Sequence, residues 1–311
     1  MRKKTLFNFI LIPLIFCISS LAYAENTFSK VYIFGDSLSD TGNLASIFGE
    51  LPAPYYKNRI TNGPVAVDTL TNKLGDTAEA SLHLIGPSVG HNYSVAGASA
   101  SGNEAIDLDT QIMSFQANHG YIAPSDALYV IFIGGNDIRA ALYETDQIIA
   151  ESIIKTAKNK IRDAIKSLKQ AGARSFYVIN APDIASIPET SLMASALNNP
   201  ELLSRASYLS NRFNRKLHRM IERLEENHKI NISEFKLDKL FSKVLDNSNK
   251  LGFTNKKDAC FSSVTYTFHP DCNYGLNIDQ FVFFDEIHPT ARVHSMFGKA
   301  FYKNLIEELE D

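Results

Sequence analysis

The chain has 311 residues, 45% of them hydrophobic and 21% charged, and its formal net charge is −3. These values are ordinary for a globular protein of one large or two small domains, and the lack of internal repeats or long linkers favours one. No block of Lys and Arg forms a nucleic-acid footprint, which sets the nucleic-acid-binding class aside.

The N-terminus has the pattern of a secretory signal peptide. Three basic residues at 2–4 precede an apolar stretch over 6–21, and Ala-Tyr-Ala at 22–24 supplies a small-x-small cleavage pattern. A retained membrane anchor is disfavoured because the apolar stretch is short and runs straight into that pattern. We therefore predict a signal peptide at 1–24, a single domain at 25–311 and an extracellular or periplasmic location. Cleavage would leave 28 basic and 34 acidic residues, a formal charge of −6.

Two cysteines, Cys260 and Cys272, would remain after cleavage. In an exported protein this number suggests one disulfide, and the short loop that it closes implies a stabilisation of roughly 3 kcal/mol or less. Free or metal-binding thiols are the alternative. Neither cysteine belongs to a C-x-x-C pair and no His/Cys cluster has zinc spacing, so we expect no metal site.

Short apolar runs that read as buried strands alternate with amphipathic helices. Strands are predicted over 31–34, 91–95, 128–133, 176–179 and 230–235. Helices are predicted over 65–74, from 153 to Gly172, from Asn199-Pro200 onward and over 291–309, whereas 242–279 is expected to be irregular. This alternation predicts an α/β fold with a mainly five-stranded parallel sheet covered by helices on both faces.

The first strand stops at Gly35-Asp36-Ser37 and presents Ser37 just outside the sheet. A serine there can be a nucleophile if a base stands beside it and amide donors face it. Capping of the next helix is the alternative. The Pro-, Tyr- and Gly-rich segment 44–62 is expected to be a surface loop, either a substrate rim or a plain connection.

Two further strand ends carry candidate oxyanion donors. The segment 96–102 consists only of small residues, which lets backbone approach a ligand closely at Gly97; tight packing is the alternative. It also holds a rival serine, Ser99, in a near miss to G-x-S-x-G. Asn136 follows the clearest buried strand, where it could donate its side-chain amide or simply form a turn.

Of the eight histidines, His228 and His288 have a carboxylate three residues earlier. His228 lies in a helix crowded with charge, which is typical of a solvated face. Asp285 and His288 lie instead in a turn after an aromatic run. A spacing of three lets the carboxylate hold one imidazole nitrogen and point the other at a serine.

Four blocks in this chain, spanning 31–290, resemble the GDSL or SGNH hydrolase family, whose signature residues are Ser, Gly, Asn and His. The matching blocks are Gly35-Asp36-Ser37-Leu38 with its extension to Asn43, Asn92 to Ala98, Gly135-Asn136-Asp137, and Asp285-x-x-His288-Pro289-Thr290. The resemblance implies a flavodoxin-like three-layer α/β/α fold. It also implies catalysis by Ser37, His288 and Asp285, with Ser37 and Gly97 N–H groups and the Asn136 amide as the oxyanion hole.

Within the family, the stretches 59–65 and 274–285 resemble the bacterial lysophospholipase A and glycerophospholipid–cholesterol acyltransferase branch. Ala66 and Ala96 depart from that pattern, since tryptophan and glycine respectively are common there. The resemblance implies a secreted serine esterase acting on lysophospholipid or phospholipid at a membrane or micelle surface, with no cofactor, metal or stable protein partner. An acyltransferase, a carbohydrate acetyl-esterase and a non-catalytic lipid-binding module are the alternatives.

Overall fold

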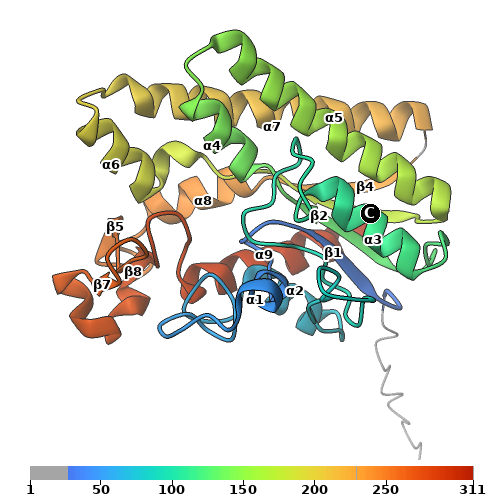
Figure 1. Cartoon of the computed structure of the whole chain (residues 1–311), viewed down its shortest axis with the longest axis horizontal. Coiled ribbons are helices and arrows are strands. Elements are labelled where there is room, and N and C mark those ends of the chain that lie inside the picture. The colour runs from blue at the N-terminus through green and yellow to red at the C-terminus, as the bar shows by residue number, and fades with distance from the viewer. Residues whose placement is uncertain (1–26, 229, 311) are drawn as a thin grey trace, which may run out of the picture.

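Four parallel strands form the centre of the molecule in a computed structural model that describes residues 27–228 and 230–310 (Figure 1). The strands are β1 (Val31–Gly35), β2 (Leu128–Phe132), β3 (Ser175–Ile179) and β4 (Asn231–Phe235), in the spatial order β1-β2-β3-β4. Their side chains are almost all buried, as expected of a parallel sheet covered on both faces. The predicted α/β class is confirmed. The predicted signal peptide lies outside the described residues.

The sheet has four strands rather than five, because 91–95 does not become a regular strand. Its backbone does follow the edge of β1: Tyr93 N–H donates to Ile33 O at 2.7 Å and Val95 N–H donates to Gly35 O at 3.1 Å. Between these two segments, however, Gly35 N–H donates to Gln111 Oε1 at 2.9 Å and not to the Tyr93 carbonyl. The Gln111 side chain thus takes a backbone donor that a continuous ladder would need, and only an isolated bridge between Ile33 and Asn92 remains on this edge of β1.

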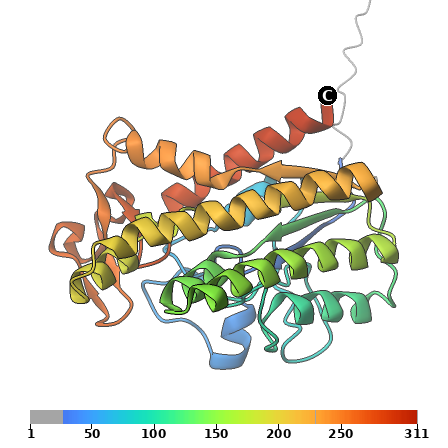
Figure 2. The same cartoon turned by 90° about the horizontal axis from the view of Figure 1, so that it is seen from above.

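Helices cover both faces of the sheet, and Figure 2 shows the long α5 and α7 side by side on one of them. That face carries α3 (Leu108–Asn118), α4 (Gly135–Tyr143), α5 (Gln147–Ala171) and α7 (Glu201–His228). The other carries α2 (Ala66–Lys73) packed on α9 (Ala291–Glu310). Shorter elements are α1 (Asn43–Phe48), η1 (Ile184–Ser186), α6 (Pro188–Ala196) and α8 (Leu237–Asp246).

Local sequence explains where the long helix α5 begins and ends. Asp146 accepts hydrogen bonds from the N–H groups of Ile148 and Ile149, which satisfies free donors of the first turn. Gly172 ends the helix with φ +122°, in the region that favours glycine. None of the helices in the described ranges combines the length and apolarity that a membrane crossing requires.

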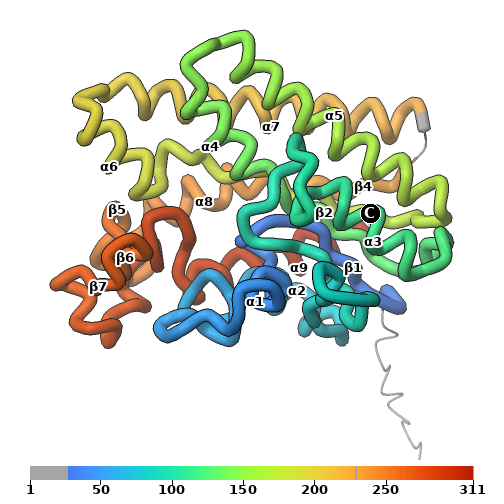
Figure 3. Tube along the Cα trace, in the orientation of Figure 1, coloured from blue at the N-terminus to red at the C-terminus, as the bar shows by residue number. Residues whose placement is uncertain are grey.

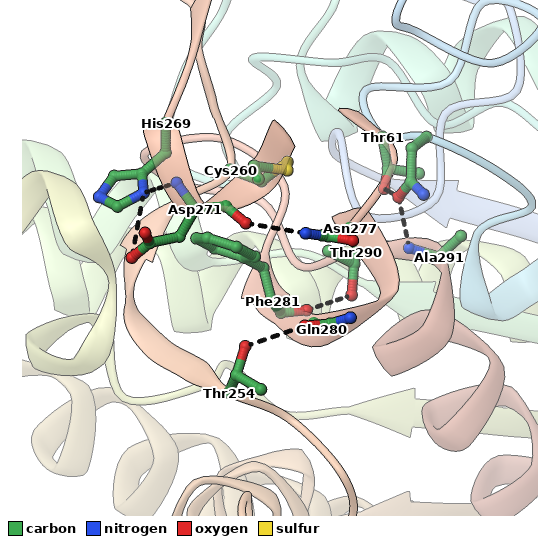
Figure 4. The surroundings of a disulfide bond; sticks show 12 residues. Thr61, Thr254, Cys260, His269, Asp271, Asn277, Gln280, Phe281, Thr290 and Ala291 are labelled. Atoms are coloured by element: carbon green, nitrogen blue, oxygen red, sulfur yellow. Dashed lines mark hydrogen bonds and ion pairs between the residues drawn. A yellow bond between two sulfur atoms is a disulfide. The ribbon is translucent and has the colours of Figure 1, made fainter. Parts of the chain in front are cut away.

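Small strands and 3₁₀ turns form a separate lobe at one end of the molecule (Figure 3). Its elements are β5 (Asn255–Ala259), β6 (Phe261–Ser262), β7 (Thr267–Phe268), η2 (Pro270–Gly275) and η3 (Ile278–Gln280). The predicted irregular segment therefore begins later than expected, since residues 242–246 belong to α8. A disulfide joins Cys260 and Cys272, both buried against Phe281 (Figure 4).

The disulfide lobe is fastened to β8 (Phe281–Phe283), the strand that leads to Asp285. β5 pairs in parallel with β8, and Cys260 N–H donates to Phe283 O at 3.1 Å. Phe261 N–H donates to Phe284 O at 2.8 Å. The disulfide thus closes a loop whose backbone supports β8, the last strand before the turn that carries Asp285 and His288.

Replacing both Cys260 and Cys272 by serine should lower the free energy of unfolding by about 2–3 kcal/mol, because the unfolded chain regains the entropy of a short loop. Urea unfolding of the oxidised wild-type chain and of the double variant measures the difference. The wild-type chain treated with reductant is the control and should unfold like the variant. Identical midpoints for all three would show that the disulfide does not stabilise the fold.

Candidate active site

Ser37, His288 and Asp285 come together at the carboxyl end of β1. His288 Nε2 lies 2.7 Å from Ser37 Oγ, although the two residues are 251 positions apart. His288 Nδ1 lies 2.8 Å from both Asp285 carboxylate oxygens. Asp285 is 2% exposed and His288 8% exposed. A nucleophile, a base and a carboxylate that orients the base thus form one continuous chain of contacts.

The Asp285 carboxylate also shapes the turn that carries the histidine. Its Oδ1 accepts hydrogen bonds from the main-chain N–H groups of Ile287, at 2.9 Å, and His288, at 2.7 Å. Phe284 N–H donates to His288 O at 2.8 Å, and Thr61 Oγ donates to Pro289 O at 2.8 Å. The turn that carries the His288 imidazole is therefore held by hydrogen bonds on both sides of the histidine.

The two backbone N–H groups of the predicted oxyanion hole are not used by hydrogen bonds inside the described part of the chain. Within the described part of the chain, the N–H groups of Ser37 and Gly97 have no hydrogen-bond acceptor. Gly97 has φ +87°, a conformation that favours glycine. Its neighbour Ala96 donates its N–H to Asp40 Oδ2 at 2.8 Å, which holds the loop at that point.

Buried polar side chains fasten this glycine loop to the loop after β1. Asp40 accepts the N–H groups of Gly42 at 2.8 Å and Asn43 at 2.7 Å, in addition to Ala96. From the other side, Asn92 donates its amide to Ser39 O at 2.6 Å. The two blocks are therefore locked together by contacts inside the protein, away from solvent.

Asn136 lies in the first turn of α4, directly after β2. Its Nδ2 donates to Ala98 O at 2.8 Å and its Oδ1 accepts from Arg139 Nη1 at 3.0 Å. The entry to the helix requires glycine at Gly134, which has φ +133° and where a Cβ would come within 2.4 Å of the Phe213 ring. The amide nitrogen of Asn136 is thereby oriented toward the glycine loop.

Sequence reasoning missed Arg139 and Glu189, which form a partly buried ion pair beside Asn136. Arg139 Nε and Nη2 meet the two Glu189 oxygens at 2.7 and 2.6 Å, a bidentate geometry. Glu189 N–H in turn donates to Glu286 O at 2.8 Å, next to the Asp285 turn. The i,i+3 spacing of Asn136 and Arg139 was a signal in the sequence. Glu189 comes from a distant helix and left none.

Hydrogen bonds show what two other positions singled out in the sequence do in the fold. Ser99 Oγ donates to Asp107 Oδ1 at 3.0 Å and accepts the N–H of Gly102, so this serine braces its own loop. In the segment after α1, Asn62 Oδ1 accepts the N–H of Ala291 at 2.8 Å at the start of α9. That contact ties the end of the segment to α9 and does not separate a substrate rim from a plain connection. The side chain of His228 lies outside the described residues.

An apolar pocket opens beside Ser37 and His288. Its walls are mostly hydrophobic and come from the η1–α6 region, α8, β8 and α9; the apolar lining residues are Leu38, Pro182, Ile184, Ile187, Phe241, Phe283, Ile287, Pro289 and Phe297. Ser37, Asn136 and His288 also line this pocket. Within residues 27–228 and 230–310, no three side chains of metal-ligating type gather in one place.

Asp36 lies beneath the pocket, next to Ser37, and is 3% exposed. Burial raises the pKa of its carboxyl from 3.8 to about 7, an effect opposed by the hydrogen bond from Leu38 N–H at 3.0 Å and by nearby His288. The site therefore contains an acid that titrates near neutral pH, separate from Asp285.

Comparison with known proteins agrees with this geometry. The family model of GDSL-like Lipase/Acylhydrolase matches residues 31–301. The phosphatidylcholine-sterol acyltransferase of Aeromonas hydrophila is 27% identical over 265 residues, which are 83% of this chain and 72% of that protein. The GDSL esterase/lipase ACHE of Zea mays is 28% identical over 281 residues, 75% of this chain and 70% of its own.

A solved structure is similar at a greater distance. A catalytic mutant of an acetylxylan esterase from Geobacillus stearothermophilus has a TM-score of 0.44 and 13% identity, over 89% of this chain and 93% of its own. That likeness is too weak to bear on the fold or the substrate. The family match, by contrast, spans most of the sequence. The chain belongs to the GDSL-like lipase/acylhydrolase family, and it is a hydrolase of lipid or other acyl esters.

Replacing Asp36 by asparagine should make the stability of the protein less dependent on pH. The folded chain keeps a proton on Asp36 up to about pH 7, whereas the unfolded chain loses it near pH 4. The wild-type protein therefore loses stability as pH rises through this window. The variant should exceed the wild type by roughly 1–4 kcal/mol at pH 8 and match it near pH 4. Urea unfolding measures both, and parallel pH curves would contradict the burial argument.

Proposed function

We propose that this chain is an exported lysophospholipase A that works through an acyl-enzyme on Ser37. The observation that carries the proposal is the unbroken contact from Asp285 through His288 to Ser37 Oγ, at 2.8 and 2.7 Å, beside an apolar pocket. Burial of the Asp–His pair keeps water from competing for these hydrogen bonds. The family match supports the reaction class.

The reaction begins when Ser37 Oγ attacks the ester carbonyl carbon and His288 Nε2 takes its proton. Asp285 holds the imidazole in place and stabilises the imidazolium that forms. The tetrahedral intermediate collapses as His288 returns the proton to the leaving glycerophospho-alcohol, and the acyl group stays on Ser37. Water then attacks this ester with His288 as base again, and the fatty acid leaves.

The developing oxyanion would be held by three donors: the N–H groups of Ser37 and Gly97, which have no acceptor among the described residues, and the Asn136 amide. In the free protein that amide donates to Ala98 O, and its second hydrogen is available to the substrate. Such donors act by stabilising charge that exists only in the transition state.

Two observations favour a lipid acyl chain over a small acyl group. The pocket next to Ser37 is lined mostly by hydrophobic side chains, which would bury methylene groups at about 0.8 kcal/mol each. The Aeromonas hydrophila relative is named as an acyltransferase that uses phosphatidylcholine. That name also makes acyl transfer to a sterol a second candidate, in which an alcohol replaces water in the last step.

A head-to-head assay separates the two reactions. The whole purified chain is given a lysophospholipid or a phospholipid, with and without cholesterol. Release of free fatty acid irrespective of the sterol supports a lysophospholipase, whereas formation of cholesteryl ester at the expense of fatty acid supports an acyltransferase. Export is tested separately: the secreted protein should begin at Glu25, and a mass-spectrometric mass that retains residues 1–24 would contradict the signal peptide.

Replacing Ser37 by alanine should lower turnover of a lysophospholipid by on the order of 10⁴-fold or more, because no other group can form the acyl-enzyme. Ser99→Ala is the matched control and should cost about tenfold at most, since it removes a loop hydrogen bond. Steady-state kinetics with both variants decide the nucleophile. If the Ser99 variant is the inactive one, the assignment of Ser37 is wrong.

Replacing Arg139 by glutamine should lower kcat with little change in KM, because the Asn136 amide loses the donor that fixes its orientation. Asn136→Ala itself should cost roughly 10²–10³-fold. Since Arg139 would act through Asn136, the double variant Arg139→Gln/Asn136→Ala should be no slower than Asn136→Ala alone. Effects that simply multiply would show that Arg139 acts by another route.

A further inference from the structure

Positively charged side chains from α5 and α7 line a groove between the two helices. Seven cationic side chains line it: Lys155, Lys158, Arg162, Lys166, Lys216, Arg219 and Arg223. The other lining residues are Met220, Leu224 and Asn227, so no carboxylate is among the described residues that line the groove. This is unexpected for a chain whose formal net charge is −3.

Most of this charge is not neutralised by neighbouring acids. Arg162 pairs with Asp163, at 2.9 Å, and Lys216 approaches Glu151, at 3.8 Å. Lys158 donates to the neutral Asn159 side chain, also from α5. For the remaining four, Lys155, Lys166, Arg219 and Arg223, the described residues offer no acidic partner. Four of the seven cations are half-buried along the groove walls and the others are exposed.

Gathering like charges in this way costs stability. Burial lowers the pKa of Lys158, and the positive charges of Arg162, Lys216 and Arg223 lower it further. The cations lining the groove repel one another, and no acidic side chain lines the groove between them. Such a surface indicates that a negatively charged ligand from outside the chain balances the charge. The groove is about 16 Å long, because Lys155 and Lys166 are eleven steps apart along α5 and each step rises about 1.5 Å.

The groove is separate from the candidate active site. Ser37 and His288 lie at the carboxyl end of β1, whereas α5 ends near the amino end of β2. There Ala123 N–H donates to Ala171 O at 2.8 Å, five residues before β2 begins. Figures 1 and 2 show α5 and α7 as the outer layer over the sheet. A ligand in the groove would therefore leave the serine site open.

We propose that the α5–α7 groove binds a flexible anionic chain with closely spaced phosphate groups, such as linear polyphosphate. Cations along two facing walls match a chain that lies lengthwise between them. The groove has no aromatic lining residue on which bases could stack, which disfavours single-stranded nucleic acid. Its apolar lining residues, Met220 and Leu224, are buried and leave nothing to insert into a bilayer, which disfavours a lipid surface.

Binding to the whole chain is measured with four probes: inorganic polyphosphate, orthophosphate, oligothymidylate and phosphatidylglycerol vesicles. We expect polyphosphate to bind tightest, and its affinity to fall roughly 50-fold between 50 and 200 mM salt if four cations contact phosphates. Orthophosphate should bind far more weakly because it spans only part of the groove. Tighter binding of the oligonucleotide or the vesicles than of polyphosphate would overturn the proposal.

A matched pair of variants locates the site. The groove variant changes Lys155, Lys166, Arg219 and Arg223 to glutamine, and the control changes the exposed Lys243, Lys250, Lys257 and Lys299 to glutamine, with the same loss of charge. Polyphosphate affinity should fall at least tenfold in the groove variant and less than about twofold in the control. Equal losses would mean diffuse attraction by net charge and would refute a defined site.

Thermal unfolding without ligand checks that the groove variant is folded and as stable as the wild type. Because the groove variant relieves repulsion, its Tm should be equal to or above that of the wild type, and its hydrolysis of a soluble ester should be unchanged. Polyphosphate should raise the Tm of the wild type and the control but not that of the groove variant. A groove variant that melts below the control in the absence of ligand would contradict the premise of uncompensated charge.

Discussion

The site depends on one buried carboxylate, that of Asp285, which acts on backbone and side chain at once. It accepts two main-chain N–H groups of the following turn and both of its oxygens lie 2.8 Å from His288 Nδ1. A carboxylate with one of these functions alone would leave either the turn or the ring free to move. With both, the imidazole has one position, and that position is in contact with Ser37.

Two other buried carboxyl groups, those of Asp40 and Asp137, fasten the loops around the site. Asp40 joins the loop after β1 to the glycine loop, and Asp137 accepts the N–H groups of Ala100 at 2.8 Å and Ser101 at 2.7 Å. Burial raises the pKa of both carboxyls, while the main-chain donors act in the opposite direction. Loops that contain many small residues are thus held by buried hydrogen bonds to carboxyl groups as well as by packing.

The sequence predicted those features that local chemistry determines. The strand ending at Ser37, the Asp285–His288 spacing and the amphipathic stripe of α5 each follow from a few adjacent residues. Features set by distant contacts were not predictable. The segment 91–95 has strand composition, yet the Gln111 side chain takes the Gly35 N–H that would continue its pairing with β1. Arg139 and Glu189 meet only because α4 and α6 converge, and the basic groove needs two helices about sixty residues apart.

These observations assign separate tasks to the two halves of the molecule. The carboxyl ends of the strands hold a polar relay beside an apolar pocket, which fits ester chemistry on a hydrophobic acyl group. The helical layer carries a groove of uncompensated cations well removed from that chemistry. An enzyme that acts on a lipid and binds a polyanion elsewhere would have its catalytic and binding surfaces under independent control.

The most direct measurement is the site at which a fluorophosphonate probe attaches. Such a probe forms a covalent bond only with a serine whose hydroxyl is activated by a base and whose oxyanion hole is formed. Peptide mass spectrometry of the labelled, folded chain should place the adduct on Ser37, and labelling should disappear after denaturation. An adduct on Ser99, or a folded chain that takes up no probe at all, would contradict the central claim that Ser37 is an activated nucleophile.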